Sequence, residues 1–294
     1  MAQIELGAMQ GDSTDVPQVS IGMPVHNGEL FIREALDSLL GQTFVDFELI
    51  ISDNASTDRT EAICLEYAEK DYRIRYVRQI ENMGALNNFK FVLNEAVGKY
   101  FLWAAHDDRR DKRFLELTVS VLDEQDEVGL VFSEMHVTDL VSLTSYKSSF
   151  GYSDSNNLFC KYLFRLSQCC PNLIYGLHRA SVLRRASPSI LSSPEFDYSD
   201  VSLTHWYELN SKIKVIPLAL FTAGENGKRI PYGLNSKFIS NKLFFKNEKA
   251  LLRSKLSFAQ YIFAYLLLKF QFGKNTRRIN QIIKLHSNIS DNRA

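Results

Sequence analysis

Cysteine is scarce in this sequence, and its few copies are arranged neither for metal binding nor for cross-linking. None of the cysteines has the C-x₂-C spacing typical of zinc sites, and their positions provide no disulfide framework. Such cysteine usage fits a reducing compartment, so we expect a cytoplasmic location. The four cysteines are Cys64, Cys160, Cys169 and Cys170.

Long apolar runs and a secretion signal are also missing. No stretch has the uninterrupted apolar length of a membrane span. The first 17 residues lack the basic start and the apolar core of a signal peptide. We therefore expect residues 1–17 to be a flexible leader.

Glycine-rich phosphate loops are absent as well. The first predicted strand, at residues 19–24, is not followed by G-x-G-x-x-G, which argues against a dinucleotide-binding cradle. The G-x-x-x-x-G-K-[ST] pattern of P-loop enzymes does not occur either. A bound nucleotide would therefore need a different kind of phosphate site.

Net charge is absent overall, but the two ends of the sequence differ strongly. The 294 residues contain 34 Lys and Arg against 34 Asp and Glu. From residue 237 onward, 12 Lys and Arg accompany only two acids, so this tail carries +10 and the rest of the chain −10. The asymmetry predicts a basic extension at 237–294 on an acidic body.

Strand-like and helix-like patterns alternate along the body. β-branched and apolar runs predict strands, and apolar residues at helical spacing predict helices between them. The alternation predicts the α/β fold class, with one mostly parallel mixed sheet flanked by helices. Asp58 and Glu61 have the spacing of a capping box at a helix start. Strands are predicted at 19–24, 47–53, 74–79, 100–105, 128–137 and 212–220, and helices at 29–40, 84–98, 113–125, 158–168 and 201–209.

Polar side chains follow three of the predicted strands. Asn27 follows the first, residues 53–58 end the second, and Asp107 with Asp108 follow the strand at 100–105. One such end is an ordinary helix cap or solvated turn, but the carboxyl ends of neighbouring parallel strands meet at one edge, where ligands bind. Adjacent carboxylates repel each other. A divalent cation, which prefers oxygen ligands, would offset that repulsion and neutralise a diphosphate.

Three segments, in this order, resemble the family 2 glycosyltransferases of GT-A fold. The resemblance is dense over residues 18–135 and looser up to about residue 225. It implies one GT-A domain over 18–236, with a nucleotide-binding part at 18–135 and an acceptor-side part at 136–236. The segments are MPVHNG at 23–28, LIISDNASTDRT at 49–60, and the stretch from ENMG to AHDD at 81–108.

The resemblance assigns a nucleotide-sugar site to these strand ends. It implies that Asp53 accepts a hydrogen bond from the base, typically uracil. Asp107 and Asp108 share the ribose and metal roles, with Asp108 favoured as the ligand of a divalent metal, Mn²⁺ or Mg²⁺. The residues implied to line the nucleotide, ribose or diphosphate are Pro24, Val25, Asn27, Asn82 and Gly84.

Two further residues are implied outside this edge. Asp200 stands where the family places its catalytic base at a helix start; Asp197 and Glu195 are nearby alternatives, and each could instead cap the helix. Arg179 offers a cation near the phosphates or, equally, a surface salt bridge. One departure from the family pattern is Ala105, where another acid is expected.

The implied reaction is a direct displacement that inverts the anomeric carbon. Asp200 would take the proton of the acceptor hydroxyl, and the metal would stabilise the leaving diphosphate. A saccharide or a lipid-linked molecule is the expected acceptor, in the synthesis of a bacterial surface polysaccharide or lipopolysaccharide. The alternatives are a sugar nucleotidyltransferase and a non-catalytic scaffold that binds nucleotide sugars, which Ala105 favours.

The basic extension contains an amphipathic segment. Phe258, Ile262, Leu266 and Phe270 recur at four-residue spacing among aromatic and branched residues, and basic residues flank them. Residues 255–284 would fit peripheral contact with an anionic membrane. A helix packed on the body or on a second subunit fits the pattern equally. Nucleic acid is not an expected partner, because the body contains no recognition motif for it.

Overall fold

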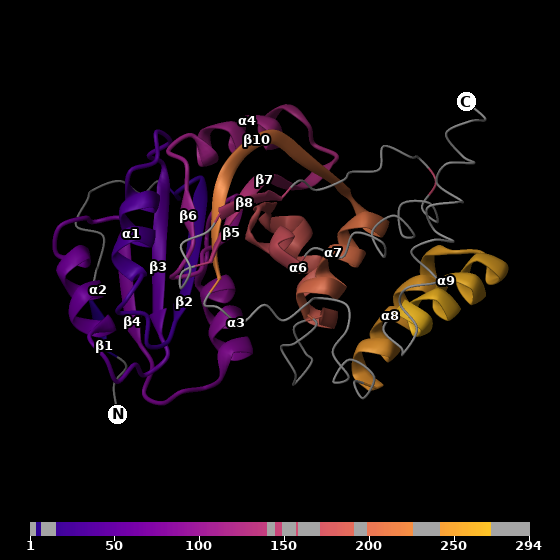
Figure 1. Cartoon of the computed structure of the whole chain (residues 1–294), viewed down its shortest axis with the longest axis horizontal. Helices are drawn as coiled ribbons and strands as arrows, with labels where there is room; N and C mark the ends of the chain where they lie inside the picture. Colours follow the sequence, from indigo (N-terminus) through magenta and orange to yellow (C-terminus); the bar gives the residue numbers. More distant parts are fainter. Residues whose placement is uncertain are drawn as a thin grey trace. The chain divides into compact units, whose positions relative to one another are not determined.

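The computed structural model describes residues 4–6, 16–139, 145–148, 157, 171–190, 199–225 and 242–271 (Figure 1). The chain divides into two compact units, so the acceptor-side part predicted at 136–236 is shared between them. The first unit consists of Met1–Ser149, Tyr175–Arg185 and Lys214–Gly227, and the second of Phe150–Ile174, Ala186–Ile213 and Lys228–Ala294.

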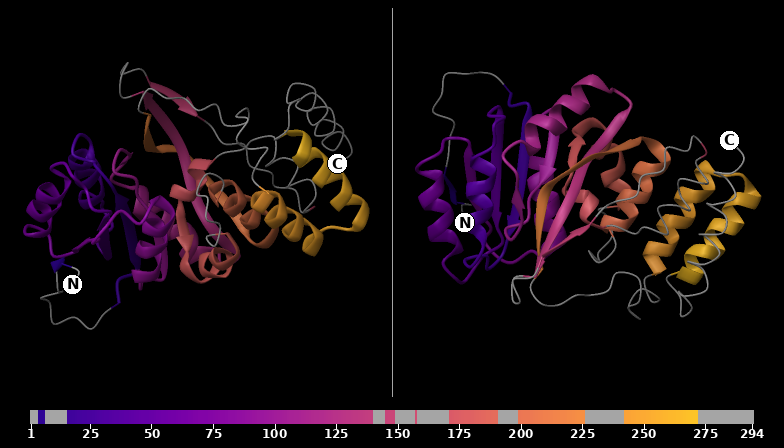
Figure 2. Two further views of the ribbon diagram at one scale, coloured as in Figure 1. Left: turned by 90° about the horizontal axis from the view of Figure 1, so that it is seen from below. Right: turned by 45° about the horizontal axis from the view of Figure 1, so that its top comes forward.

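The described strands form one ten-stranded mixed sheet (Figures 1 and 2). The strand order is β1-β4-β3-β2-β5-β9-β7-β10-β6, and β8 pairs with β7. The predicted α/β class, with a mixed sheet flanked by helices, is confirmed. The strands are β1 (Ile4–Leu6), β2 (Val19–Val25), β3 (Phe47–Asp53), β4 (Ile74–Arg78), β5 (Tyr100–Trp103), β6 (Arg109–Arg110), β7 (Val128–Asp139), β8 (Ser145–Ser148), β9 (Leu177–Arg179) and β10 (Lys212–Glu225).

The four strands β4, β3, β2 and β5 run parallel. Their register places Val25 opposite Asp53, and Asp53 opposite Arg78. Every residue of β2 is buried, which explains its nearly continuous apolar sequence. A Cβ atom at Gly22 would lie only 2.7 Å from Cγ2 of Val92, so the glycine allows helix α3 (Ala85–Glu95) to pack directly on this strand.

The handedness of the strand connections decides which face of the sheet each helix covers. The chain moves outward from β2 to β3 to β4 and then returns to β5 beside β2. Because such crossovers are right-handed, α1 (Ile32–Leu40) and α2 (Thr60–Ala68) lie on one face of the sheet and α3 on the other. The order of strands therefore reverses between β2 and β5, and this switch point is where open α/β sheets bind ligands.

Beyond β5 the sheet becomes antiparallel. The three-residue strand β9 pairs with both β5 and β7, and α4 (Phe114–Glu124) packs on β7 and β9. Within the segment expected to be a flexible leader, β1 pairs antiparallel with β4. The short strands β1, β6, β8 and β9 were not predicted separately, because each has too few residues to show a period. The helix predicted at 158–168 lies outside the described residues.

The remaining described segments are mostly helical. A 3₁₀ turn, η1 (Pro171–Tyr175), precedes β9, and α6 (Ala180–Ile190) follows it. The second unit contains α7 (Ser199–Asn210), α8 (Lys242–Lys255) and α9 (Phe258–Gln271), and α8 packs against both α7 and α9. Within the described ranges, no helix combines the length and the apolar character needed to cross a bilayer.

Candidate functional site

The loops that follow β2, β3, β4 and β5 meet at the carboxyl edge of the parallel strands. The loop after β5 contacts the loop after β2, because a Cβ atom at Gly28 would lie 2.9 Å from Cδ2 of His106. The loops after β3 and β4 are joined by Asn54, which donates to Oδ1 of Asn82 at 2.8 Å. Four separate segments of the chain thus form one surface at the switch point of the sheet.

Hydrogen bonds fasten the loop after β2 to the loop after β3. The backbone N–H of Asn27 donates to Oγ of Ser56 at 2.9 Å, and Oδ1 of Asn27 accepts the N–H of Thr57 at 2.8 Å. Asn27 and Ala55 have φ angles of +54° and +57°, in the left-handed region. This conformation is rare for a residue such as alanine, and the surrounding hydrogen bonds hold it.

The carboxylates of Asp58 and Glu29 complete this junction, each by accepting a backbone N–H from the other loop. The N–H of Glu29 donates to Oδ2 of Asp58 at 3.1 Å, and the N–H of Arg59 donates to Oε2 of Glu29 at 3.0 Å. Burial opposes ionisation of Asp58, but hydrogen bonds from Thr60 and Glu29 outweigh it and lower the pKa of Asp58. The predicted capping box is wrong, because the N-cap residue of α2 is Arg59, which makes no side-chain capping hydrogen bond, and Oε2 of Glu61 lies 3.4 Å from Nη1 of Arg78.

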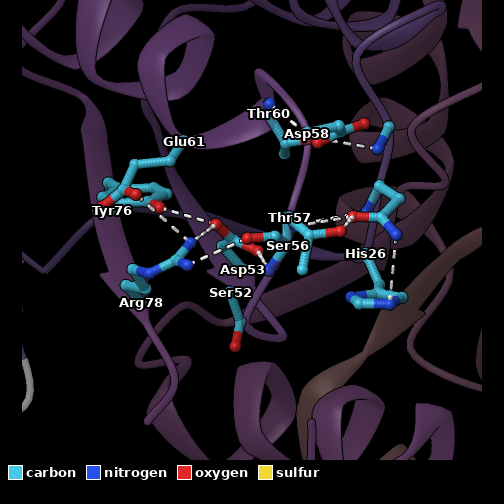
Figure 3. Close-up of polar contacts among 12 residues, drawn as sticks. His26, Ser52, Asp53, Ser56, Thr57, Asp58, Thr60, Glu61, Tyr76 and Arg78 are labelled. Atoms are coloured by element: carbon cyan, nitrogen blue, oxygen red, sulfur yellow. Dashed lines mark hydrogen bonds and ion pairs between the residues drawn. The ribbon is translucent and has the colours of Figure 1, made fainter. Parts of the chain in front are cut away.

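Asp53 is the centre of a buried cluster at the end of β3 (Figure 3). Its side chain has no exposed surface. Oδ1 accepts the N–H of Ser56 at 2.8 Å, and Oδ2 accepts the Tyr76 hydroxyl at 2.8 Å and Nη1 of Arg78 at 2.7 Å. Burial and the neighbouring carboxylate raise the pKa of Tyr76, which keeps the phenol a hydrogen-bond donor. Asp53 therefore organises its surroundings through internal bonds.

Arg78 is the member of this cluster that reaches solvent. Its side chain keeps 26% of its surface exposed, and Nη2 donates to the carbonyl of Ser56 at 2.9 Å. Figure 3 shows the guanidinium between Asp53, Ser56 and Glu61. The guanidinium is therefore fixed by its partners while part of its surface stays exposed to solvent.

The loop after β4 is shaped by two amide side chains. Oδ1 of Asn54 accepts the N–H of Met83, and Oδ1 of Asn82 accepts the N–H of Gly84, both at 2.9 Å. Gly84 has a φ of +83°, which favours glycine, and precedes α3. No side chain caps this helix start, which follows the loop after β4.

Asp107 and Asp108 lie at the end of β5, as predicted, but in different environments. Asp107 is half-buried, whereas Asp108 is 4% exposed. Oδ1 of Asp108 accepts the N–H of Gly224 from β10 at 3.1 Å. Burial, with a smaller contribution from the charge of Asp107, raises the pKa of Asp108 to about 7.

The buried side chain of Arg110 lies near the carboxyl group of Asp108. Nη2 of Arg110 donates to the carbonyls of Trp103 at 3.0 Å and Tyr175 at 3.2 Å, and the guanidinium carbon lies 5.0 Å from the ring centroid of Phe221. Within the described part of the chain, Nε and Nη1 have no hydrogen-bond partner. Burial lowers the pKa of Arg110 to about 10, so the side chain stays cationic and attracts Asp108.

The residues at the end of β5 fit a hard divalent cation. They offer carboxylate oxygens, and the raised pKa of Asp108 indicates that its negative charge is incompletely compensated. The described residues contain no cluster of three or more His, Cys, Asp or Glu side chains suited to a metal. Magnesium commonly takes one or two carboxylates and completes its coordination with phosphate oxygens and water, which matches this small donor set.

Arg179 does not belong to this edge, and its predicted position near the phosphates is wrong. It lies opposite Tyr100, at the amino end of β5. Its guanidinium donates to the carbonyls of Leu122 at 2.6 Å and Gln125 at 3.2 Å, at the end of α4. Arg179 therefore caps the carboxyl end of a helix, where a cation is favourable. It also lies 3.9 Å from Oδ1 of the exposed Asp126, as the salt-bridge alternative expected.

Asp200 lies in the first turn of α7, a helix start as predicted. It belongs to the second unit, and its catalytic role stays a prediction. Its alternatives, Asp197 and Glu195, lie outside the described residues. Pro24 and Val25 are buried at the end of β2, beside the site.

Sequence reasoning missed four residues that shape this site. Tyr76 and Arg78 lie on β4, the strand next to β3, so their pairing with Asp53 depends on strand order. Asn54 occurs within the quoted motif, but its partner Asn82 is 28 residues away. Arg110 lies in a basic stretch, where no local pattern distinguishes a buried arginine from a solvated one. For Tyr76 and Arg78 the one available signal was that both are polar residues near the end of a predicted strand.

Solved structures share this fold. The chain resembles a crystal structure of Staphylococcus aureus TarS, residues 1–349, in complex with UDP-GlcNAc, with a TM-score of 0.64 and 20% identity over 87% of this chain and 73% of that one. It also resembles the mannosyltransferase PcManGT from Pyrobaculum calidifontis in complex with GDP-Man and Mn²⁺, with a TM-score of 0.53 and 16% identity over 88% and 70% of the two chains. The fold is that of GT-A enzymes, as predicted.

Sequence relatives identify the family within that fold. Residues 20–187, more than half of the chain, match the model of glycosyl transferase family 2, and the chain belongs to this family, as predicted. It is 35% identical over 119 residues to an uncharacterized glycosyltransferase of Rickettsia typhi, covering 40% of this chain and 36% of that protein. It is 31% identical over 114 residues to the glycosyltransferase GlyA of Streptococcus pneumoniae, covering 38% and 16%. The matched region thus spans well under half of either relative.

Proposed function

We propose that this chain is an inverting glycosyltransferase that moves a sugar from a nucleotide sugar, a UDP-sugar in the first instance, to a hydroxyl group of a saccharide or lipid-linked acceptor. The observation that carries the proposal is the acidic end of β5, Asp107 and Asp108, at the switch point of a family 2 sheet. The ligands named for TarS and PcManGT support a nucleotide-sugar donor.

The nucleoside would lie against the loops after β2 and β3. Asn27 is exposed there and held in a fixed conformation, and Arg78 presents its free surface. Asp53 would then act mainly through Arg78, by fixing the direction of its guanidinium, because the carboxylate itself is fully buried. Asn82 and Gly84 would face the ribose and the diphosphate, beside the uncapped start of α3.

Asp108, with Asp107 beside it, would hold a divalent metal, Mn²⁺ or Mg²⁺. When bound, such an ion neutralises the diphosphate of the donor and so stabilises the leaving group. The Gly224 amide fixes Oδ1 of Asp108, and Arg110 holds the ends of β5 and η1 together behind it. These contacts would keep the carboxylate in one orientation as the donor enters and leaves.

Asp200 would serve as the general base for the acceptor hydroxyl. Asp200 lies in the first turn of α7, the position at a helix start that the family resemblance implies for the base. General base catalysis of this kind contributes about 10²–10⁴-fold to a rate. Action in the synthesis of a bacterial surface polysaccharide or lipopolysaccharide, and the cytoplasmic location, stay predictions.

The experiment that tests this proposal is a screen of nucleotide sugars by thermal shift, followed by donor hydrolysis and transfer assays with Mn²⁺ or with a chelator. A UDP-sugar should raise the melting temperature, and more so with Mn²⁺. Asp108→Asn should remove the Mn²⁺-dependent part of UDP binding. Asp126→Asn, which changes a fully exposed carboxylate, is the matched control.

The outcomes separate the alternatives. If Asp108→Asn binds UDP in Mn²⁺ as tightly as the wild type does, Asp108 is not the metal ligand. Asp200→Asn should bind the donor normally but lose transfer, and substantial remaining turnover would place the base elsewhere. Binding of UDP with neither hydrolysis nor transfer for any donor would favour a scaffold. Formation of a nucleotide sugar from a sugar phosphate and a nucleoside triphosphate would instead indicate a sugar nucleotidyltransferase.

A further inference from the structure

Helix α9 presents an apolar face to solvent. Phe258 is 78% exposed, and Ile262, Phe263 and Leu266 are 39%, 42% and 49% exposed. At 100° per residue these positions, together with the exposed Ala259, lie on one side of the helix. Between Phe258 and Leu268, all positions in the exposed class are apolar. We call these five residues the α9 stripe.

The opposite side of α9 is already used for packing. Tyr261, Ala264, Leu267 and Leu268 are buried, and so is Leu252 of the neighbouring helix α8. The stripe is therefore additional to the core of this helix pair. A surface helix normally carries polar residues on its outer side, so the apolar outer side between Phe258 and Leu268 indicates a partner.

Helix α8 provides positive charge beside the stripe. Lys249, Arg253 and Lys255 are exposed, and Nζ of Lys249 lies 5.8 Å from the ring centroid of Tyr265 on α9. Tyr265 is half-buried and lies next to the stripe around the helix axis. Along α8 and α9 the sequence contains six Lys and Arg but a single acid, Glu248. The apolar stripe and the basic helix therefore adjoin one another.

We propose that the α8–α9 helix pair binds the surface of an anionic membrane, with the α9 stripe at the boundary between headgroups and acyl chains and the basic residues of α8 on headgroup phosphates. An anionic lipid surface complements both features at once. A second copy of this chain would complement the stripe but would bring the same positive charge close to it. The 14 residues of α9 extend about 21 Å, too short to cross a bilayer of about 30 Å.

This inference is independent of the proposed reaction, because it rests on a surface of the second unit. The predicted membrane segment was 255–284. Residues 272–284 lie outside the described part of the chain, whereas the structure adds α8 as the source of charge. A membrane position would bring the enzyme to acceptors that are themselves held in a lipid layer.

The test is flotation of the full chain with vesicles of phosphatidylcholine alone or mixed with phosphatidylglycerol. We expect binding to the mixed vesicles that weakens as salt is raised, and little binding to phosphatidylcholine. Leu266→Gln should reduce binding at least fivefold, whereas Leu218→Gln should not. Leu218 is the matched control because it is the same residue type, 45% exposed against 49%, on β10.

A second pair of variants tests the charge. Arg253→Gln should weaken binding to the mixed vesicles about fivefold, as expected for one basic residue near an anionic surface. Lys112→Gln, an exposed lysine just before α4, should have no effect. Circular dichroism and melting temperature should be unchanged in all four variants, since these side chains are exposed.

Three results would overturn the proposal. The first is absence of binding by the wild-type chain to the mixed vesicles. The second is an equal loss of binding in a variant and its control, which would indicate unspecific attraction. The third is a concentration-dependent dimer that Leu266→Gln dissociates, in a chain without affinity for lipid; the stripe would then be an interface between copies.

Discussion

Two buried aspartates lie at the carboxyl ends of β3 and β5, the two strands that flank β2, yet their surroundings differ. Asp53 ends β3 and is hydrogen-bonded to a backbone amide, a phenol and a guanidinium. Asp108 follows β5 and accepts one backbone hydrogen bond, and its pKa is raised to about 7. The fold compensates the charge of Asp53 by three hydrogen bonds, whereas the charge of Asp108 is compensated only in part, by the Gly224 amide and the attraction of Arg110. The incompletely compensated carboxylate of Asp108 is the one that suits the proposed cation, whereas Asp53 suits a structural role.

The largest expected loss of stability tests the structural half of this comparison. Asp53→Asn should destabilise the protein by about 2–3 kcal/mol, because it leaves Arg78 and Tyr76 facing an amide instead of a carboxylate. Urea unfolding at neutral pH measures this change. Asp126→Asn serves as the exposed control and should remain within about 0.5 kcal/mol of the wild type. A loss as small as that of the control would show that Asp53 is not a structural centre.

The next effect is expected for Asp108→Asn, which should instead stabilise the protein, by an amount that depends on pH. Because burial raises the pKa of Asp108 from 3.8 to about 7, the folded protein keeps a proton that the unfolded chain has released. The raised pKa has no effect on the free energy of unfolding below about pH 4. It lowers this free energy progressively between about pH 4 and 7, and the loss is constant above that. A shift of the pKa from 3.8 to about 7 corresponds to roughly 4 kcal/mol, so Asp108→Asn should stabilise the protein by up to about 4 kcal/mol at pH 8, and hardly at pH 4.

Melting temperatures at the two pH values, recorded with a chelator present, measure this difference. The chelator matters because a bound cation would supply the compensating charge and hide the effect. Equal shifts at both pH values would mean that Asp108 is ionised without penalty, and the contrast with Asp53 would then fail.

The smallest expected effect concerns the loop beside Asp53. Ser56→Ala removes the hydroxyl that accepts the Asn27 amide but keeps the Ser56 N–H that donates to Asp53. A loss of about 1 kcal/mol is expected for one partly buried hydrogen bond. Ser120→Ala, on the exposed side of α4, is the control for urea unfolding. A loss similar to that of Asp53→Asn would mean that the two residues act as one unit.

The sequence predicted the parallel half of the sheet better than the antiparallel half. Strands β2, β3 and β5 are apolar because both their faces are buried, and that pattern is local. The strand direction of β9 depends on its partners β5 and β7, which no local pattern encodes. Arg179 was misplaced for this reason: in an antiparallel strand it lies at the amino end of β5.

The sequence predicted which strand ends carry the polar residues of the site, but not which side chains they contact. Asp107 and Asp108 were found because two adjacent acids after an apolar run are unusual. Arg110 could not be read in the same way, since a basic residue two positions later is expected in solvent, yet it is 5% exposed. Its burial depends on Phe221 and Tyr175, more than 60 residues away in sequence.

The hydrogen bonds between Asn27, Ser56 and Thr57 have a consequence for ligand affinity. They join the loops after β2 and β3 into a single rigid body whose conformational entropy is lost when the protein folds. A small molecule that touches both loops therefore surrenders only its own freedom on binding, since the receptor surface is already ordered. Affinity at this edge should accordingly respond more to the rigidity of the ligand than to rearrangement of the protein.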